Sequence, residues 1–114
     1  MNVYDKAHET ARALKESQQG KKYETAREAL KKNEENWQVL QDFRVRQSEL
    51  QAKILEGEPV PGEKMDELNR LFLILTQNPV IMEYLQAELE LITVIEDIQQ
   101  ILLKAVELGK PAQE

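Results

Sequence analysis

The sequence predicts an all-α protein, a helical bundle of four to five helices, and three observations support this. Ala, Leu, Glu, Lys and Gln, which have high helix propensity, dominate the composition. Only four glycines and four prolines interrupt the 114 residues. Apolar residues recur three and four positions apart, the period of an amphipathic helix. The length suits one domain with a buried core, so we expect a single all-helical domain over residues 1–114.

Two short helices are expected first. One runs from about Asn2 to Ser17, with Asn2 as its N-cap. Its apolar residues follow helical spacing: Val3, Ala7, Ala11 and Leu14. Gly20 then interrupts the pattern, and the second helix is expected over residues 21–32.

Asn33 can end the second helix or cap a third, which is expected to continue to about Glu56. The stretch GEPVPGE at 57–63 cannot continue a helix, because its two prolines lack amide donors and restrain the residues before them. We therefore expect a Pro/Gly loop at 57–63, followed by a fourth helix with apolar residues from Met65 onward.

The most apolar run of the chain is LFLIL at 71–75. It continues the spacing of the fourth helix, and it is too short for a membrane span, which takes about 20 apolar residues. Asn78-Pro79 follows, and it ends one helix and begins another, because Asn caps helices and Pro fits the first helical position. The run is therefore expected where two helices meet.

The last helix, about 79–108, has an apolar arc two stripes wide. One stripe contains Tyr84, Ala87, Leu91, Val94, Ile98, Ile101, Ala105 and Leu108, and the other contains Ile81, Leu85, Ile92, Ile95, Leu102 and Val106. At about 1.5 Å per residue the helix is about 45 Å long, whereas a compact globule of this chain length is about 35 Å across. We therefore expect a homodimer or higher oligomer in which one stripe faces a second copy. The alternative is that the chain's own helices cover both stripes. The predicted interface residues are Tyr84, Leu91, Val94, Ile98, Ile101 and Leu102.

Charge and composition exclude several classes of protein. The chain has no cysteine, which excludes disulfides, thiolate metal sites and cysteine nucleophiles. Its net charge of −6 argues against nucleic-acid or membrane-surface binding by the whole molecule. Residues 1–55 hold 11 basic and 9 acidic side chains, and residues 56–114 hold 4 and 12. This polarity can orient subunits or partners, although a solvated helical surface gives the same count. The opening MNVYDKAHE shows no signal pattern, so we expect a cytoplasmic protein.

No set of residues suggests catalysis, a cofactor or a metal. His8, the single histidine, lacks the Ser and Asp partners of a triad. Adjacent acidic residues such as Glu34 and Glu35 point about 100° apart on a helix and cannot coordinate the same metal ion. The patterns of a di-iron bundle, an EF-hand and a glycine-rich phosphate loop are missing. We expect a non-enzymatic protein with no catalytic, cofactor-binding or metal-binding residue and no small-molecule substrate.

The segment KKYETAREALKK offers an alternative function, direct contact with RNA or a partner. Its basic side chains can bind phosphates, and Tyr23 lies among them. Glu24 and Glu28 dilute the positive charge, so a solvated helix face is favoured over a nucleic-acid site. The candidate contact residues are Lys21, Lys22, Arg27, Lys31 and Lys32.

An ordered set of motifs covers nearly the whole chain. The third helix carries Phe43-x-x-x-Gln47-x-x-Leu50-x-x-x-Ile54-x-x-Gly57. Asn78-Pro79 then leads into Tyr84-Leu85-x-Ala87-Glu88 and the long apolar last helix. With the short amphipathic first helix and the polar loop, these motifs resemble the YlbF/YmcA family of small all-helical bacterial proteins, particularly its YheA-like branch.

This resemblance implies a homo-oligomeric, all-α cytoplasmic protein of a Gram-positive, Bacillus-type bacterium. Better-known members act as non-enzymatic regulatory partners in a complex that modulates an RNA-degrading enzyme, with effects on competence, sporulation and biofilm formation. Those members are linked to iron–sulfur clusters through cysteine, which this chain lacks, so cluster binding does not carry over. We therefore expect a regulatory adaptor that binds itself and another cytoplasmic protein.

Overall fold

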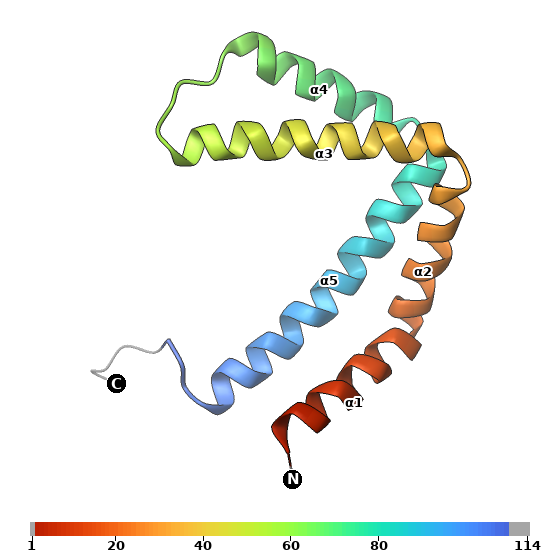
Figure 1. Cartoon of the computed structure of the whole chain (residues 1–114), viewed down its shortest axis with the longest axis vertical. Helices are drawn as coiled ribbons and strands as arrows, with labels where there is room; N and C mark the ends of the chain where they lie inside the picture. The colour runs from red at the N-terminus through yellow and green to blue at the C-terminus, as the bar shows by residue number, and fades with distance from the viewer. Residues whose placement is uncertain (1, 110–114) are drawn as a thin grey trace. The chain divides into compact units, whose positions relative to one another are not determined.

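The computed structural model describes residues 2–109, and the described chain forms five helices (Figure 1). They are α1 (Val3–Glu16), α2 (Gln18–Lys31), α3 (Glu34–Leu55), α4 (Gly62–Thr76) and α5 (Pro79–Ala105). No strand occurs among the described residues, so the predicted all-α class is confirmed.

The contacts within the chain group into two compact units. The terminal unit comprises Met1–Tyr23 and Gln86–Glu114, of which residues 2–23 and 86–109 are described. The central unit comprises Glu24–Leu85. Both α2 and α5 contribute residues to each unit. The single domain over residues 1–114 stays a prediction.

Asparagine side chains cap helices where the sequence predicts them. Asn2 Oδ1 accepts a hydrogen bond from the Tyr4 amide at 2.8 Å, at the start of α1. Asn33 Oδ1 accepts one from the Asn36 amide at 3.1 Å, at the start of α3. Asn78 does the same for α5. In each case the side chain satisfies backbone donors that the first helical turn leaves without partners.

The break between the first two helices lies at Ser17, so the predicted start of the second helix after Gly20 was wrong. The Ser17 hydroxyl donates to the Leu14 carbonyl at 2.6 Å and accepts from the Gly20 amide at 3.0 Å. Gly20 is buried in the first turn of α2, where a Cβ would lie 2.2 Å from the Leu14 oxygen and 2.7 Å from the Lys15 oxygen. Glycine is needed here for close approach to the end of α1, not to stop a helix.

Two other predicted boundaries were wrong by two or three residues. The loop predicted at 57–63 ends at Pro61, and Gly62 already begins α4. A proline restrains itself and the residue before it, but not the residues after it. The last helix ends at Ala105 rather than near 108. Glu107 has a φ of +53°, a left-handed conformation that does not occur within a right-handed helix.

The core of the central unit is built from α2, α3, α4 and the start of α5. Its buried apolar residues are Leu30, Leu40, Phe43, Leu50, Leu75, Ile81 and Tyr84. The rings of Phe43 and Phe72 meet with centroids 5.9 Å apart. The LFLIL run lies in α4, as predicted, with Leu75 buried and Leu73 exposed, because consecutive residues point around the whole helix. No described helix is long and apolar enough to cross a membrane.

Candidate functional site

The part of α5 in the terminal unit becomes steadily more exposed toward its carboxyl end. Ala87 is fully buried. Leu91, Val94 and Ile98 are half-buried. Every residue from 99 to 109 is exposed. The chain's own helices therefore cover one stripe of α5 only at its amino-terminal end, and they leave the other end open.

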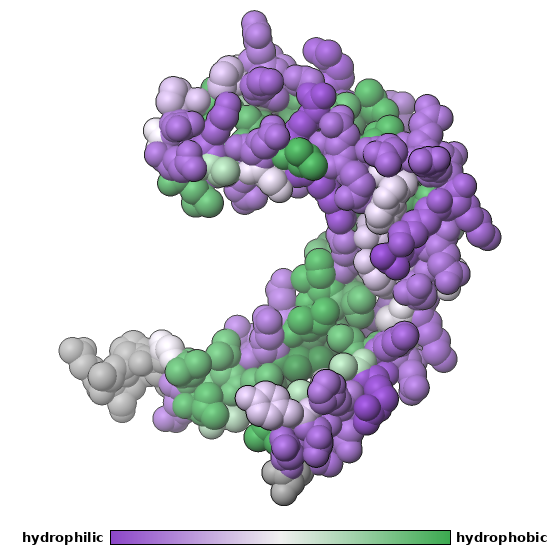
Figure 2. All heavy atoms as spheres, viewed as in Figure 1, coloured by the Kyte–Doolittle hydropathy of each residue, from purple (hydrophilic) through white to green (hydrophobic). Residues whose placement is uncertain are grey.

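Large apolar side chains are exposed along this part of α5 and just beyond its last residue, Ala105. Figure 2 shows hydrophobic surface gathered along the terminal-unit part of α5. Their exposed fractions range from 36% to 70%. These exposed side chains are Leu89, Ile92, Ile95, Ile101, Leu102, Leu103, Val106 and Leu108. We call them the α5 apolar face.

The six predicted interface residues fall into three environments. Tyr84 lies in the core of the central unit, with the Arg44 guanidinium 5.7 Å from its ring centroid. The next three along the helix are half-buried within the terminal unit: Leu91, Val94 and Ile98. Ile101 and Leu102 are 66% and 62% exposed, and they belong to the α5 apolar face. That all six contact a second copy stays a prediction.

Two residues of this face lie outside both predicted stripes. Leu89 and Leu103 are exposed on α5, and neither was assigned to an apolar stripe. The consecutive residues 101–103 indicated an apolar arc wider than the two predicted stripes, because three consecutive apolar residues spread over about 200° of a helix. A single neighbouring helix cannot cover such an arc.

A charged contact borders the half-buried stripe of α5. Lys22 Nζ donates to both carboxylate oxygens of Glu90, at 3.0 and 3.1 Å. The pair connects α2 to α5, and because both side chains are partly exposed it adds little stability. The two residues are 68 positions apart, which is why the sequence did not reveal the pair.

The five basic candidates for RNA or partner contact do not lie in one unit. Lys21 and Lys22 belong to the terminal unit, and the other three belong to the central unit: Arg27, Lys31 and Lys32. Lys22 is held by Glu90. The Lys31 ammonium lies 5.2 Å from the Trp37 ring centroid, a cation–π contact. Two of the five charges are therefore engaged within the chain itself.

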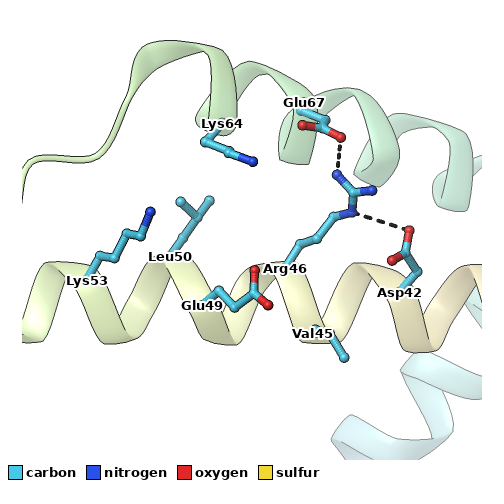
Figure 3. Close-up of a pocket in the computed structure, with 8 residues that line it drawn as sticks. All are labelled: Asp42, Val45, Arg46, Glu49, Leu50, Lys53, Lys64 and Glu67. Atoms are coloured by element: carbon cyan, nitrogen blue, oxygen red, sulfur yellow. Dashed lines mark hydrogen bonds and ion pairs between the residues drawn. The ribbon is translucent and has the colours of Figure 1, made fainter.

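A charged pocket of about 350 Å³ lies between α3 and α4 of the central unit (Figure 3). Arg46 donates to Asp42 at 3.3 Å and to Glu67, so it connects the two helices. The pKa of Arg46 is raised above its ordinary value, mainly by the charge of the Asp42 carboxylate and secondly by the hydrogen bond to Glu67. The residues that line the pocket are Asp42, Val45, Arg46, Glu49, Leu50, Lys53, Lys64 and Glu67.

This pocket has no nucleophile beside a general base, and Arg46 keeps its proton at any physiological pH. Its chemistry is that of a structural ion-pair network. Among the described residues, no group of three or more His, Cys, Asp or Glu side chains is placed to hold a metal ion. His8 lies on the exposed surface of α1. The expected absence of catalysis, cofactors and metals stays a prediction.

The geometry agrees with comparisons to known proteins. The profile of the family described as "Control of competence regulator ComK, YlbF/YmcA" matches residues 3–107. The chain belongs to this family. The resemblance found in its motifs is thereby confirmed.

Relatives match this chain over almost its full length. A UPF0342 protein of Symbiobacterium thermophilum is 42% identical over 109 residues, covering 96% of this chain and 97% of the relative. A UPF0342 protein of Caldicellulosiruptor bescii is 42% identical over 106 residues, covering 93% and 89%. A solved structure, a protein of unknown function (DUF964) from Bacillus stearothermophilus, matches with a TM-score of 0.79 at 19% identity, covering 92% of each chain. This last likeness supports the fold alone.

Proposed function

We propose that the chain is a non-enzymatic regulatory protein of the cytoplasm that acts by binding a second copy of itself and another protein. The α5 apolar face is the observation that carries the proposal. Eight large aliphatic side chains, each more than a third exposed, follow one another over residues 89–108. Such a surface on a soluble protein marks a site of association.

The energetics favour association over exposure. Burying a Val, Leu or Ile side chain fully contributes about 1.5–3 kcal/mol. The exposed parts of the eight side chains, counted on both copies, therefore contribute a free energy of the same order as the cost of association, about 4–15 kcal/mol. The interface we propose is centred on these apolar side chains.

The family supports the regulatory part of the proposal. Its description refers to control of a competence regulator, ComK, and the relatives compared above carry no enzymatic name. We propose a role of the same kind here, with the partner drawn from the control of gene expression or RNA processing. The finer links to competence, sporulation or biofilm formation belong to this proposal.

The test is the association state of a variant in which the α5 apolar face is interrupted. Leu102→Asp puts a charge on a side chain that is 62% exposed, so the fold of the isolated chain is expected to survive. Leu73→Asp is a matched control, because Leu73 is also a helical leucine with 62% exposure, on α4 of the central unit. Sedimentation equilibrium then compares both variants with the parent chain, and circular dichroism checks their helix content.

We expect the parent and Leu73→Asp to associate. We expect the dissociation constant of Leu102→Asp to be at least about tenfold higher, because burying a leucine contributes more than about 1.4 kcal/mol. A parent chain that is monomeric at high concentration contradicts self-association. Equal association of both variants shows that the α5 apolar face is not the interface.

Direct RNA binding through Lys21, Lys22, Arg27, Lys31 and Lys32 was the alternative, and no contact in the structure favours it. Lys22 and Lys31 are already engaged by Glu90 and Trp37. Capture of the crosslinked protein from cells, with and without ribonuclease, separates the two functions. Partners that survive ribonuclease support the adaptor. Partners lost with the RNA, together with an affinity that falls steeply with salt, support the alternative.

A further inference from the structure

In the terminal unit, the amino-terminal end of α1 and the carboxyl end of α5 are both exposed. None of the residues of α1, all of which the structure describes, is buried. Residues 2–13 are exposed, and Val3 and Tyr4 are 79% and 77% exposed. Residues 99–109 at the end of α5 are exposed as well. Two helices of one unit with exposed ends leave apolar surface that further helices can cover, and a four-helix bundle is a usual way to cover it.

From this we infer that the amino-terminal half of α1 in one copy covers the carboxyl end of α5 in a second copy, and the reverse. The inference rests on the proposed self-association and names the segments that meet. Each chain carries both halves of the interface, so a two-fold axis satisfies both at once.

The shapes of the two faces are complementary. α1 presents small residues at helical spacing, Ala7 and Ala11, beyond the larger Val3. The end of α5 presents large branched side chains such as Leu102 and Val106. Large residues on one helix pack best against small residues on the facing helix, because the side chains then interdigitate without voids.

Charge is complementary between the longer stretches of the terminal unit that contain these two segments. Residues 2–23 carry five basic and three acidic side chains, and residues 86–109 carry one basic and five acidic ones. Arg12 and Lys15 of α1 have no hydrogen-bonding or ionic side-chain partner among the described residues, and neither do Glu96 and Asp97 of α5. A second copy in this arrangement brings unpaired positive and negative charges to the same rim.

The available area matches what a dimer needs. A stable interface buries about 800 Å² on each partner, of which roughly 500 Å² is apolar. The α5 apolar face with Val3 and Tyr4 comprises ten large side chains that are 36–79% exposed. A fully exposed side chain of this size has roughly 60–120 Å² of apolar surface, so the ten, at their observed exposed fractions, provide roughly 400–700 Å².

The absence of cysteine from the chain allows a direct test. Single-cysteine chains are prepared at two positions on each face: Val3→Cys, Ala7→Cys, Leu102→Cys and Val106→Cys. Each α1 variant is mixed with each isotope-labelled α5 variant and oxidised. Because each chain has one thiol, every disulfide joins two copies. Val45→Cys is the matched control partner, since Val45 is an exposed apolar helical residue of the central unit.

We expect at least one of the four α1–α5 pairs to cross-link at least about tenfold more than the Val45 pairs, because docking raises the effective concentration of the two thiols to the millimolar range. Cross-linking also needs Cα atoms within about 7 Å, so the pairs that react give the register. If all four pairs stay at the control level while sedimentation shows a dimer, this inference is wrong and the proposed self-association stands. Preferential α5–α5 disulfides overturn it in the same way. A monomeric chain in sedimentation overturns both.

Discussion

The side-chain amide of Asn78 donates a hydrogen bond to the side-chain oxygen of Asn36 at 2.9 Å. This bond ties the start of α5 to the first turn of α3 within the central unit. Asn78 also caps α5, because its oxygen accepts from the amides of Val80 and Ile81 at 3.1 and 3.3 Å. One side chain therefore begins α5 and also anchors it to the neighbouring helix.

The first prediction separates these two roles. Asn36→Ala removes only the bond between the side chains and should lower the free energy of unfolding by about 1 kcal/mol. Asn78→Ala removes the cap as well and should cost about 2 kcal/mol, or roughly 8 °C in melting temperature for a chain of this length. Urea unfolding followed by circular dichroism measures both. The double variant should cost little more than Asn78→Ala alone, and full additivity would contradict the shared bond.

The second prediction concerns Gly20, where a Cβ would lie 2.2 Å from the Leu14 carbonyl oxygen. Gly20→Ala should destabilise the chain by about 1–3 kcal/mol, although alanine favours a helix, because the backbone of α1 must shift. Gly62→Ala is the control, since nothing lies within 4 Å of a Cβ there, and it should be neutral or stabilising by up to about 1 kcal/mol. Thermal unfolding of both variants checks the contrast. A Gly20→Ala variant as stable as the parent would rule out the close approach.

The third prediction concerns Arg46 and the pairing of α3 with α4. Arg46→Gln should increase amide hydrogen exchange along the pocket, because it removes the charge that Asp42 and Glu67 share. High salt should reduce the difference from the parent, since both ion pairs are partly exposed.

The pH dependence of this Arg46 effect follows from the sign of its pKa shift. The pKa of Arg46 is raised in the folded chain, chiefly by Asp42. Its contribution is therefore complete below the ordinary pKa of arginine and is lost only as pH rises through the higher folded value. The difference in stability between parent and Arg46→Gln should be level from about pH 7 to about pH 10. A marked slope over that interval would assign the effect to another group.

The fourth prediction uses the pair formed by Lys22 and Glu90. Lys22→Glu places two acids together and should lower stability by up to about 1 kcal/mol. Adding Glu90→Lys should restore part of the loss, because the reversed pair can form in the same place. Unfolding of the single and double variants at low salt measures the coupling. No rescue by the double variant would mean that the two side chains act independently.

The sequence anticipated the features that depend on neighbours in the chain. The asparagine caps, the proline loop and the helical nature of LFLIL all follow from interactions within a few residues, and the structure contains each of them. The ends of the loop and of α5 were misplaced by two or three residues, because a helix end is set by small differences in local free energy.

The candidate site was anticipated only in part. An apolar arc too wide for one neighbour was evident in the sequence, and the exposed Ile101 and Leu102 are part of it. Heptad spacing also selected Tyr84, which lies in the core of the central unit. Periodicity reports that a residue is apolar and on a given face, but it does not say which surface covers that face.

The sequence by itself determined the all-α class, the helix starts that asparagine caps and the apolar arc of the last helix, because these arise from interactions between residues a few positions apart. The tertiary structure alone decided that Gly20 lies against the end of α1, that Arg46 reaches Glu67, and that the end of α5 is left uncovered. Those outcomes depend on how helices pack against one another. Packing joins side chains from separate helices, and a local pattern contains no information about which helices meet.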